Sequence, residues 1–178
     1  MLKKKHKKME KGIKEIFTRT SIRNFKETEI SKSDIELLLK SAMQAPSAGN
    51  QQGWEFIIVD EKETLEKLSK VSPYSSPAKK APICIVILGN IQKMKYPENV
   101  DMDLSAAAMN ILLQAKAIGL GGVWLGVAPL EDRMNMVKQI FTLPDHLRPF
   151  AILPIGVPLK ENESKLRYDE SKVHWNKY

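Results

Sequence analysis

Two arginines and a serine alternate with other residues near the start of the chain. Arg19, Ser21 and Arg23 are separated by the β-branched Thr20 and Ile22. β-Branched residues favour an extended backbone, in which side chains two positions apart lie on the same face. The spacing therefore predicts a face that presents two guanidinium groups and a hydroxyl, a combination that suits a phosphate. Two solvated arginines beside a helix end are the alternative interpretation.

A second basic pair, Lys165 and Arg167, has the same spacing near the other end of the chain. In an extended segment both charges would point to one side. Taken alone, the pair also fits an exposed, solvated doublet, so its significance depends on what lies beside it.

A run of small and polar residues, 45–54, lies between a helix-like and a strand-like segment. Its lack of side-chain bulk allows the backbone to approach a flat ligand closely. Ser47, Asn50 and Gln52 add hydrogen-bonding groups, and Trp54 begins an apolar run. The segment is therefore suited to the polar edge of a planar heterocycle.

Residues 119–126 contain four glycines and superficially resemble a dinucleotide-binding fingerprint. That fingerprint follows a strand and opens a helix, so that the phosphates meet the helix N-terminus. Here the order is helix, glycine run, strand, which excludes such a site. Gly119 and Gly121 are predicted instead to end the helix in the left-handed geometry that glycine permits.

The apolar spacing predicts alternating helices and strands without a break that would mark a second domain. Helices are expected at 13–17, from the N-cap Ser31 to Pro46, near Leu65 and Leu68, and at 103–118 and 130–140. Strands are expected at 56–59, 83–88, 123–125 and 150–155, with a Pro- and Ser-rich loop at 72–82.

The helix expected at 103–118 has almost no polar face. A helix that is apolar all round must be buried on all sides. In so small a protomer this fits a subunit interface, and a central core helix fits equally well. The helix dipole explains Asp101 and Asp103 at its start, and the methionines, including Met134 and Met136, are expected in the core.

Composition sets further limits on the function. A chain of 178 residues suits one domain, here 13–178, or one protomer of an intertwined dimer. Cys84 is the only cysteine, which excludes an internal disulfide and a cysteine-based metal site and favours a reducing, cytoplasmic location. No apolar run approaches the ~20 residues of a membrane span. The three histidines lack metal-like spacing, so no metal is expected.

Most of the net charge of +7 comes from the start of the chain, because residues 1–14 hold seven lysines and one glutamate. Such a segment is typical of a solvated tail, so residues 1–12 are predicted to be disordered. The tail could contact polyanions non-specifically. No interleaved aromatic residues indicate specific nucleic-acid binding.

Together, the motifs at 18–23, 45–54, 119–126 and 165–167 resemble those of the nitroreductase family of FMN flavoproteins, in the expected order over residues 13–178. The resemblance implies an α+β protein with a mixed, largely antiparallel central sheet flanked by helices. It also implies an intertwined homodimer with two FMN sites at the interface. The chain departs from the family at Gly53, where proline is common, which predicts a looser turn. It is also short, which predicts a more open flavin.

The resemblance implies cofactor-binding roles for residues of each motif. Arg19, Ser21, Arg23, Lys165 and Arg167 would hold the FMN phosphate, with Thr20 beside them. Pro46, Ser47, Ala48 and Asn50 would contact a flavin held mainly by the other subunit, and Trp124, Leu125 and Gly126 would lie beside the reactive N5 atom.

The implied activity is hydride transfer from NADH or NADPH to FMN and on to a small electron acceptor such as a nitroaromatic, a quinone or an activated alkene. The two half-reactions would follow one another at one site, in a ping-pong exchange. Because the flavin carries the chemistry, no catalytic side chain is expected. Two alternatives stay open: a flavin-binding or flavin-consuming relative without turnover, and a polyanion-binding protein that uses the lysine-rich tail.

Overall fold

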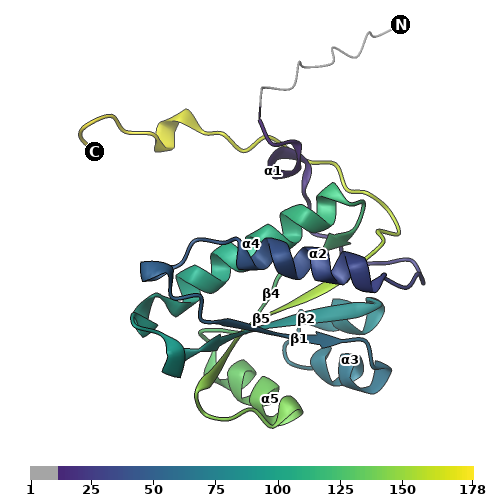
Figure 1. Ribbon diagram of the computed structural model, residues 1–178. Helices are drawn as coiled ribbons and strands as arrows, with labels where there is room; N and C mark the ends of the chain where they lie inside the picture. Colours follow the sequence, from purple (N-terminus) through teal and green to yellow (C-terminus); the bar gives the residue numbers. More distant parts are fainter. Residues whose placement is uncertain (1–11) are drawn as a thin grey trace, which may run out of the picture.

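The computed structural model describes residues 12–178 (Figure 1). The predicted disordered tail, residues 1–12, lies outside this part except for Gly12. A central sheet is covered on one face by α2 (Lys32–Met43) and α4 (Val100–Ala117) and on the other by α3 (Lys62–Leu68) and α5 (Glu131–Phe141). Within residues 12–178 no helix is long and apolar enough to span a bilayer.

The sheet has five strands, and its two longest members form the centre. The strands are β1 (Trp54–Val59), β2 (Ile83–Asn90), β3 (Gly121–Gly122), β4 (Leu125–Gly126) and β5 (Leu147–Gly156). β2 pairs with β1 and β5, and both short strands pair with β5, always antiparallel. An isolated parallel bridge joins Ser21 to Gly122. The predicted α+β architecture with a mixed, largely antiparallel sheet is confirmed.

Alternation along β2 divides the core into two layers. The isoleucines of β2 pack with α2 and α4, whereas Cys84, Val86 and Leu88 pack with residues of α3 and α5. Successive side chains of a strand point to opposite faces, so a strand that is covered on both sides must be apolar throughout. This requirement explains the continuous apolar run at 83–88.

The predicted helices are present, with ends shifted by a few residues. Ser31 caps α2 as expected, since its hydroxyl accepts a hydrogen bond from the Asp34 backbone N–H at 3.0 Å. α2 ends at Met43, just before Pro46. Within the loop at 72–82 the chain forms a short 3₁₀ helix, η2 (Ser76–Lys80).

The strand expected at 123–125 is replaced by β3 and β4, with Val123 and Trp124 between them. The prediction of one continuous strand is therefore wrong. Opposite the gap lies Pro154, whose carbonyl accepts a hydrogen bond from the Val123 N–H at 3.3 Å. Proline has no N–H to return a ladder bond, so the pairing with β5 is interrupted there.

The two glycines expected to end the long helix have different conformations. Gly119 has a φ of +80°, as the prediction of a left-handed helix end requires. Gly121 does not, because it lies in β3. A Cβ at Gly121 would lie 2.6 Å from Cγ1 of Ile22, so this glycine allows close packing of the adjacent segment.

The single chain does not bury the long helix on all sides, so the interpretation as a central core helix is wrong, whereas the subunit interface stays a prediction. α4 packs against α2 and the sheet, but Met102 and Met109 on its outer side are 63% and 42% exposed. Met43 and Met136 are also exposed, so the methionines are not uniformly core residues. The outer side of α4 is therefore an apolar surface that one chain leaves uncovered.

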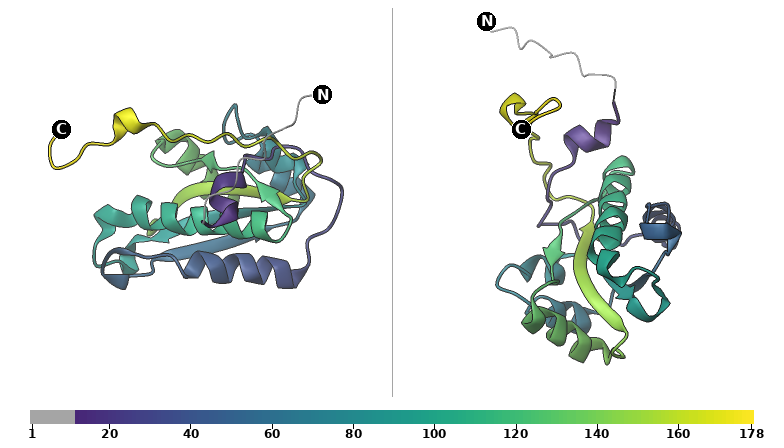
Figure 2. Two further views of the ribbon diagram at one scale, coloured as in Figure 1. Left: turned by 90° about the horizontal axis from the view of Figure 1, so that it is seen from above. Right: turned by 90° about the vertical axis from the view of Figure 1, so that its left-hand side faces the viewer.

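Both ends of the described chain lie on the outside of the fold. α1 (Lys14–Thr18) lies against α4, and its apolar Ile16 and the preceding Ile13 are exposed. Residues 159–178 are exposed throughout and extend away from the sheet (Figure 2). Short 3₁₀ helices complete the chain at η1 (Ala48–Asn50), η3 (Ile91–Lys93), η4 (Pro97–Asn99) and η5 (Glu170–Lys172).

Candidate functional site

Two of the three groups of predicted site residues lie at opposite ends of α4. The loop at 45–52 contacts the first turn of α4 through Asp103. The segment at 19–23 lies near its last turns, where Arg19, Leu112 and Lys116 line a common recess. α4 has 18 residues, so about 27 Å separate its ends at 1.5 Å per residue. A single chain therefore holds the two groups far apart.

The loop at 45–52 has an unusual backbone conformation. Gly49, Asn50 and Gln52 have φ values of 55°, 55° and 48°. Asn50 and Gln52 are not glycines, so this conformation carries a conformational cost that other contacts must offset. The Ser47 hydroxyl accepts one of these contacts, a hydrogen bond from the Gln52 N–H at 3.1 Å. Pro46 and Asn50 remain exposed, whereas Ser47 and Ala48 are half-buried.

Asp103 and Gln51 hold this loop in place, and neither was assigned to the site from the sequence. The Asp103 carboxylate is only 5% exposed. It accepts hydrogen bonds from the Ala48 N–H at 2.9 Å and from the Gln51 side-chain amide at 2.6 Å. A role in the helix dipole alone is thus an incomplete account of Asp103. The acidic residue in the first turn was visible in the sequence, but its partners lie more than 50 residues away.

Two glycines of this region make room for neighbouring side chains. A Cβ on Gly49 would lie 2.6 Å from Cε2 of Tyr96. Gly53 is buried, and a Cβ there would lie 2.6 Å from Cγ of Met94. The Met94 side chain fills the space beside Gly53, and the looser turn expected there stays a prediction.

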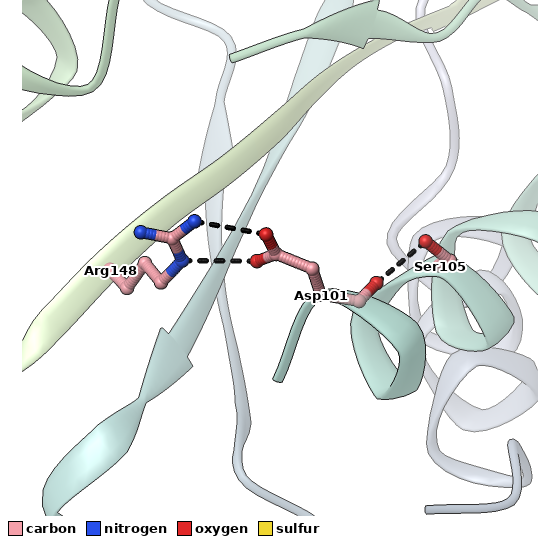
Figure 3. A network of polar contacts seen from close by, with 3 residues as sticks. All are labelled: Asp101, Ser105 and Arg148. Carbon is pink, nitrogen blue, oxygen red and sulfur yellow. Dashed lines mark hydrogen bonds and ion pairs between the residues drawn. The ribbon is translucent and has the colours of Figure 1, made fainter. Parts of the chain in front are cut away.

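Next to the loop, an ion pair joins the first turn of α4 to β5. Arg148 donates through Nε and Nη2 to the Asp101 carboxylate at 3.0 and 2.9 Å, and Ser105 donates to the Asp101 carbonyl at 2.6 Å (Figure 3). The hydrogen bonds that Arg148 donates to the Asp101 carboxylate raise the pKa of Arg148. This bidentate pair fixes the end of the helix that carries Asp103.

The segment at 19–23 is extended and lies along β3. The Ile22 N–H donates to the Gly122 carbonyl at 2.9 Å, and the Ile22 side chain is buried. Arg23, the next residue, is exposed, whereas Arg19, Thr20 and Ser21 are half-buried. The burial of Ile22 beside the exposed Arg23 is consistent with the predicted alternation.

The C-terminal segment returns beside residues 21–26. The Lys26 N–H donates to Val157, the Leu159 N–H donates to Asn24, and the Asn162 side chain donates to the Ser21 carbonyl at 2.9, 3.1 and 3.0 Å. This order is antiparallel, so the chain beyond 162 runs in the direction of Arg19 and passes α1 (Figures 1 and 2). Lys165 and Arg167 lie on this exposed continuation. The fold thus brings both basic segments to the same end of α4.

The arginines differ in what they bind. Arg133 donates to the Gly126 carbonyl at 2.9 Å, and Arg148 binds Asp101. Within residues 12–178, the side chains of Arg19, Arg23 and Arg167 have no hydrogen-bond or ion-pair partner, and neither does that of Lys165. These four cations are therefore available for an external anion.

A small recess lies beside Arg19 and Thr20. Its volume is about 10 Å³, which is the space of one water molecule. Lys116 also lines it and forms an ion pair with Glu161 at 3.0 Å. The recess of one chain is far too small for a nucleotide-sized ligand, so such a ligand would lie on the open surface formed by the basic segments.

The third group of predicted residues lies on and before β4. Leu125 is buried, and Trp124 is half-buried with its ring edge-to-face against Phe150 at 5.4 Å. Gly126 is half-buried, and a Cβ on it would meet no atom within 4 Å. The Arg133 side chain fixes the Gly126 carbonyl, so this position combines a fixed backbone with open space beside it.

A much larger hollow lies elsewhere in the described chain. It has a volume of about 1210 Å³ and is bounded by residues 24–32, α3 and η2. Lysines and acidic residues alternate around it, and none of the predicted site residues lines it. Size alone is therefore a poor guide to the site in this protein.

Comparison with known proteins identifies the family. The model of the nitroreductase family matches residues 16–81 and 72–157. An Archaeoglobus fulgidus protein, provisionally named NADH dehydrogenase/NAD(P)H nitroreductase, is 39% identical over 174 residues, covering 96% of this chain and all of the relative. The chain belongs to the nitroreductase family, a class of oxidoreductases.

Solved structures agree with this assignment. A Clostridium acetobutylicum protein, provisionally named NADH oxidase, has a TM-score of 0.90 and 45% identity, with 92% of this chain and 99% of that chain covered. An FMN-dependent nitroreductase from Clostridium difficile has a TM-score of 0.86 and 31% identity, with coverages of 92% and 98%. The recognition of a nitroreductase-like oxidoreductase from the sequence is confirmed. The roles of individual site residues stay predictions.

Proposed function

We propose that this protein is an FMN-dependent oxidoreductase that works as a homodimer. It takes reducing equivalents from NADH or NADPH and passes them to a small electron acceptor, such as a nitroaromatic, a quinone or an activated alkene. The observation that carries the proposal is the group of unpaired cations at one end of α4 in a chain of the nitroreductase family.

The residues present fit FMN. Arg19, Ser21 and Arg23, with Lys165 and Arg167 from the C-terminal segment, supply the charge and the hydroxyl that a phosphate dianion requires. A Cβ on Gly126 would meet no atom within 4 Å, so a flat ring can approach the backbone at this position. When bound, FMN supplies the centre that accepts and donates hydride. The protein then has to bind, orient and expose the ring.

The dimer is needed because the two groups of site residues are far apart in one chain. The loop with Pro46, Ser47, Ala48 and Asn50 lies about 27 Å from the phosphate segment of its own chain, judged from the length of α4. A second copy packed against the exposed apolar side of α4 can bring its loop to the first copy's cations. The exposed Met102 and Met109 favour this packing over a solvated helix face.

The residues around the ring would act by position. Ser47 and Asn50 offer hydrogen bonds to the polar edge of the ring, and the Leu125–Gly126 backbone lies near its reactive region. No side chain is required to hold a proton for this role. A donor and an acceptor that stack in turn on the same face explain a ping-pong order.

Cofactor binding and reduction provide the first test. We expect the purified protein to bind FMN stoichiometrically and its visible absorption to bleach under anaerobic NADH or NADPH. A protein that stays colourless after incubation with FMN would contradict the proposal. FMN binding without reduction would favour a non-catalytic flavin-binding relative.

Mixed dimers test whether each site contains residues from two chains. Arg19→Ala/Arg23→Ala removes two of the residues that would bind the FMN phosphate in one chain. Ser47→Ala/Asn50→Ala removes the polar side chains of the loop in the other chain. If sites form between chains, each mixed dimer holds one intact site and regains about half of the FMN binding. If each chain forms its own site, no intact site exists and binding stays low.

A further inference from the structure

The loop at 45–52 depends on a buried polar cluster that lies outside the predicted contact residues. The cluster consists of the side chains of Asp103 and Gln51 and the backbone of Tyr96. We propose that this cluster is a brace that positions the loop for FMN, and that Asp103 and Gln51 are positioning residues. The inference rests on the proposed function, because it concerns the same site.

All hydrogen-bonding groups of the Gln51 side chain are used. Its Nε2 donates to Asp103 at 2.6 Å and to the Tyr96 carbonyl at 3.1 Å. Its Oε1 accepts from the Tyr96 N–H at 2.8 Å. Two donors and one acceptor meet complementary partners, so the amide has one favourable orientation. Gln51 thereby joins the loop to the segment before α4.

Asp103 makes the brace sensitive to the position of the loop. Its carboxylate is 5% exposed, and no ion pair with it is present in residues 12–178. One of its oxygens accepts from Ala48 and the other from Gln51, so both side-chain contacts come from the loop. A buried carboxylate without these donors would be strongly destabilised. The buried charge therefore favours the one loop conformation that supplies both of them.

The brace also offsets the conformational cost of the loop. Gly49, Asn50 and Gln52 all have positive φ values, and the brace bonds Ala48 and Gln51 on either side of the first two. Ser47 and Asn50 lie in or next to the same short turn. A shift of the turn would move both of these groups relative to the ring.

Swapping the carboxylate of residue 103 and the amide of residue 51 between the two positions tests the brace directly. In Asp103→Asn, the side chain keeps only one acceptor oxygen for two donors, so either the Ala48 N–H or the Gln51 amide loses its acceptor and the loop loses one of its two hydrogen bonds to α4. In Gln51→Glu, two carboxylates face each other. The double variant Asp103→Asn/Gln51→Glu restores a donor and an acceptor in reversed order, so we expect it to recover part of what each single change loses.

Asp101→Asn is the matched control. Asp101 lies in the same first turn of α4 and binds Arg148 (Figure 3), and within residues 12–178 no hydrogen bond or ion pair joins its side chain to the loop. The Asp101→Asn substitution, like Asp103→Asn, removes one carboxylate charge from the first turn of α4. We expect it to lower the melting temperature without changing the affinity for FMN.

Two measurements separate the brace from the proposed function. Hydrogen exchange of the flavin-free protein should show faster exchange of the Ala48 amide in Asp103→Asn, and not in Asp101→Asn. Titration with FMN should show a dissociation constant raised about tenfold in Asp103→Asn and Gln51→Glu, with partial recovery in the double variant. In the same two single variants, the rate of flavin reduction at saturating NAD(P)H should fall.

The outcomes are distinguishable. If Ala48 exchanges no faster in Asp103→Asn, the brace does not exist. If exchange rises but FMN affinity and the reduction rate stay at the wild-type values, the brace is structural and does not position the cofactor. If the wild-type protein binds no FMN, the proposed function fails, and the positioning role fails with it.

Discussion

The two ends of α4 show opposite ways of preparing a binding site. At the first turn, Asp103 binds the loop through Ala48 and Gln51, and Asp101 binds Arg148. At the last turns, Arg19 and Arg23 have no partner within the described chain. The polar groups of the first end are satisfied within the chain, whereas the charges of the second end are not, and we propose that they bind an anion.

This difference separates the expected effects of mutations. Substitutions at the first turn of α4, which we call the satisfied end, should alter folding stability. Those that remove a hydrogen bond to the loop should also alter cofactor binding. Substitutions of the unpaired arginines near the last turns of α4, which we call the unsatisfied end, should alter cofactor binding and leave the stability of the flavin-free protein unchanged. The following predictions run from the largest expected effect to the smallest.

Removal of both arginines at the unsatisfied end should have the largest effect. We expect Arg19→Ala/Arg23→Ala to raise the FMN dissociation constant about 100-fold, or about 2.7 kcal/mol, because two charge-assisted contacts to the phosphate are lost. Fluorescence titration with FMN measures this change. Riboflavin, which lacks the phosphate, is the control ligand and should bind both proteins equally. A fall in the melting temperature of the flavin-free variant would show that these arginines are structural.

Removal of the ion pair at the satisfied end should act on stability. We expect Arg148→Met to lower the free energy of unfolding by about 2 kcal/mol, because the half-buried Asp101 carboxylate loses a bidentate partner. Denaturant unfolding of the flavin-free protein measures this loss. An unchanged midpoint would show that solvent replaces the guanidinium at no cost.

The packing of Gly53 should have a smaller effect of the same kind. We expect Gly53→Ala to lower the free energy of unfolding by about 1 kcal/mol, because its Cβ would crowd Met94. Met94→Ala removes the crowded side chain, so the double variant should lose less stability than the sum of the single variants. Additive losses in denaturant unfolding would mean that the two residues do not interact.

The contribution of Glu55 to the pH dependence of the free energy of unfolding should be the smallest effect. The Asn90 side chain donates to the Glu55 carboxylate at 2.6 Å, and this hydrogen bond lowers the pKa of Glu55 below its ordinary value of 4.5. A lowered pKa in the folded state means that the ionised carboxylate stabilises the fold above pH 4.5 and that this stability is lost as the pH falls through the folded pKa.

Unfolding measured over a pH series checks this prediction. We expect Glu55→Gln to lose the part of the acid sensitivity that Glu55 provides, while the wild-type protein loses stability below pH 4.5. Identical pH profiles would show that Glu55 has no net role. Because the carboxylate is partly exposed, solvent reduces the effect.

Local patterns in the sequence were sufficient for most of the fold. Apolar spacing predicted the helices, the Ser31 cap and the central strands, because burial against a sheet imposes a period on the chain itself. The break between β3 and β4 was not predicted, because it depends on Pro154, which lies about thirty residues further along. Local spacing cannot show which residue will stand opposite a strand.

The same distinction applies to the site. The alternation at 19–23, the small residues at 45–52 and the glycines at 119–126 are local patterns, and they were enough to suggest the family that the comparisons confirm. Gln51 and Asp103 were missed because their importance arises from a contact between distant segments. An acidic residue in the first turn of a helix has a sufficient local explanation, so no local signal distinguishes a brace from a cap.

The sequence by itself determined most of the secondary structure, the family and the chemical types of the site residues, because these follow from periodicity and from motifs a few residues long. Only the tertiary structure decided that the loop and the cations lie at opposite ends of α4, and which polar groups are used within the chain. Those properties depend on where an 18-residue helix places its neighbours. The physical reason is that hydrogen bonds and burial are satisfied between segments, and a sequence read along its length does not show which segments meet.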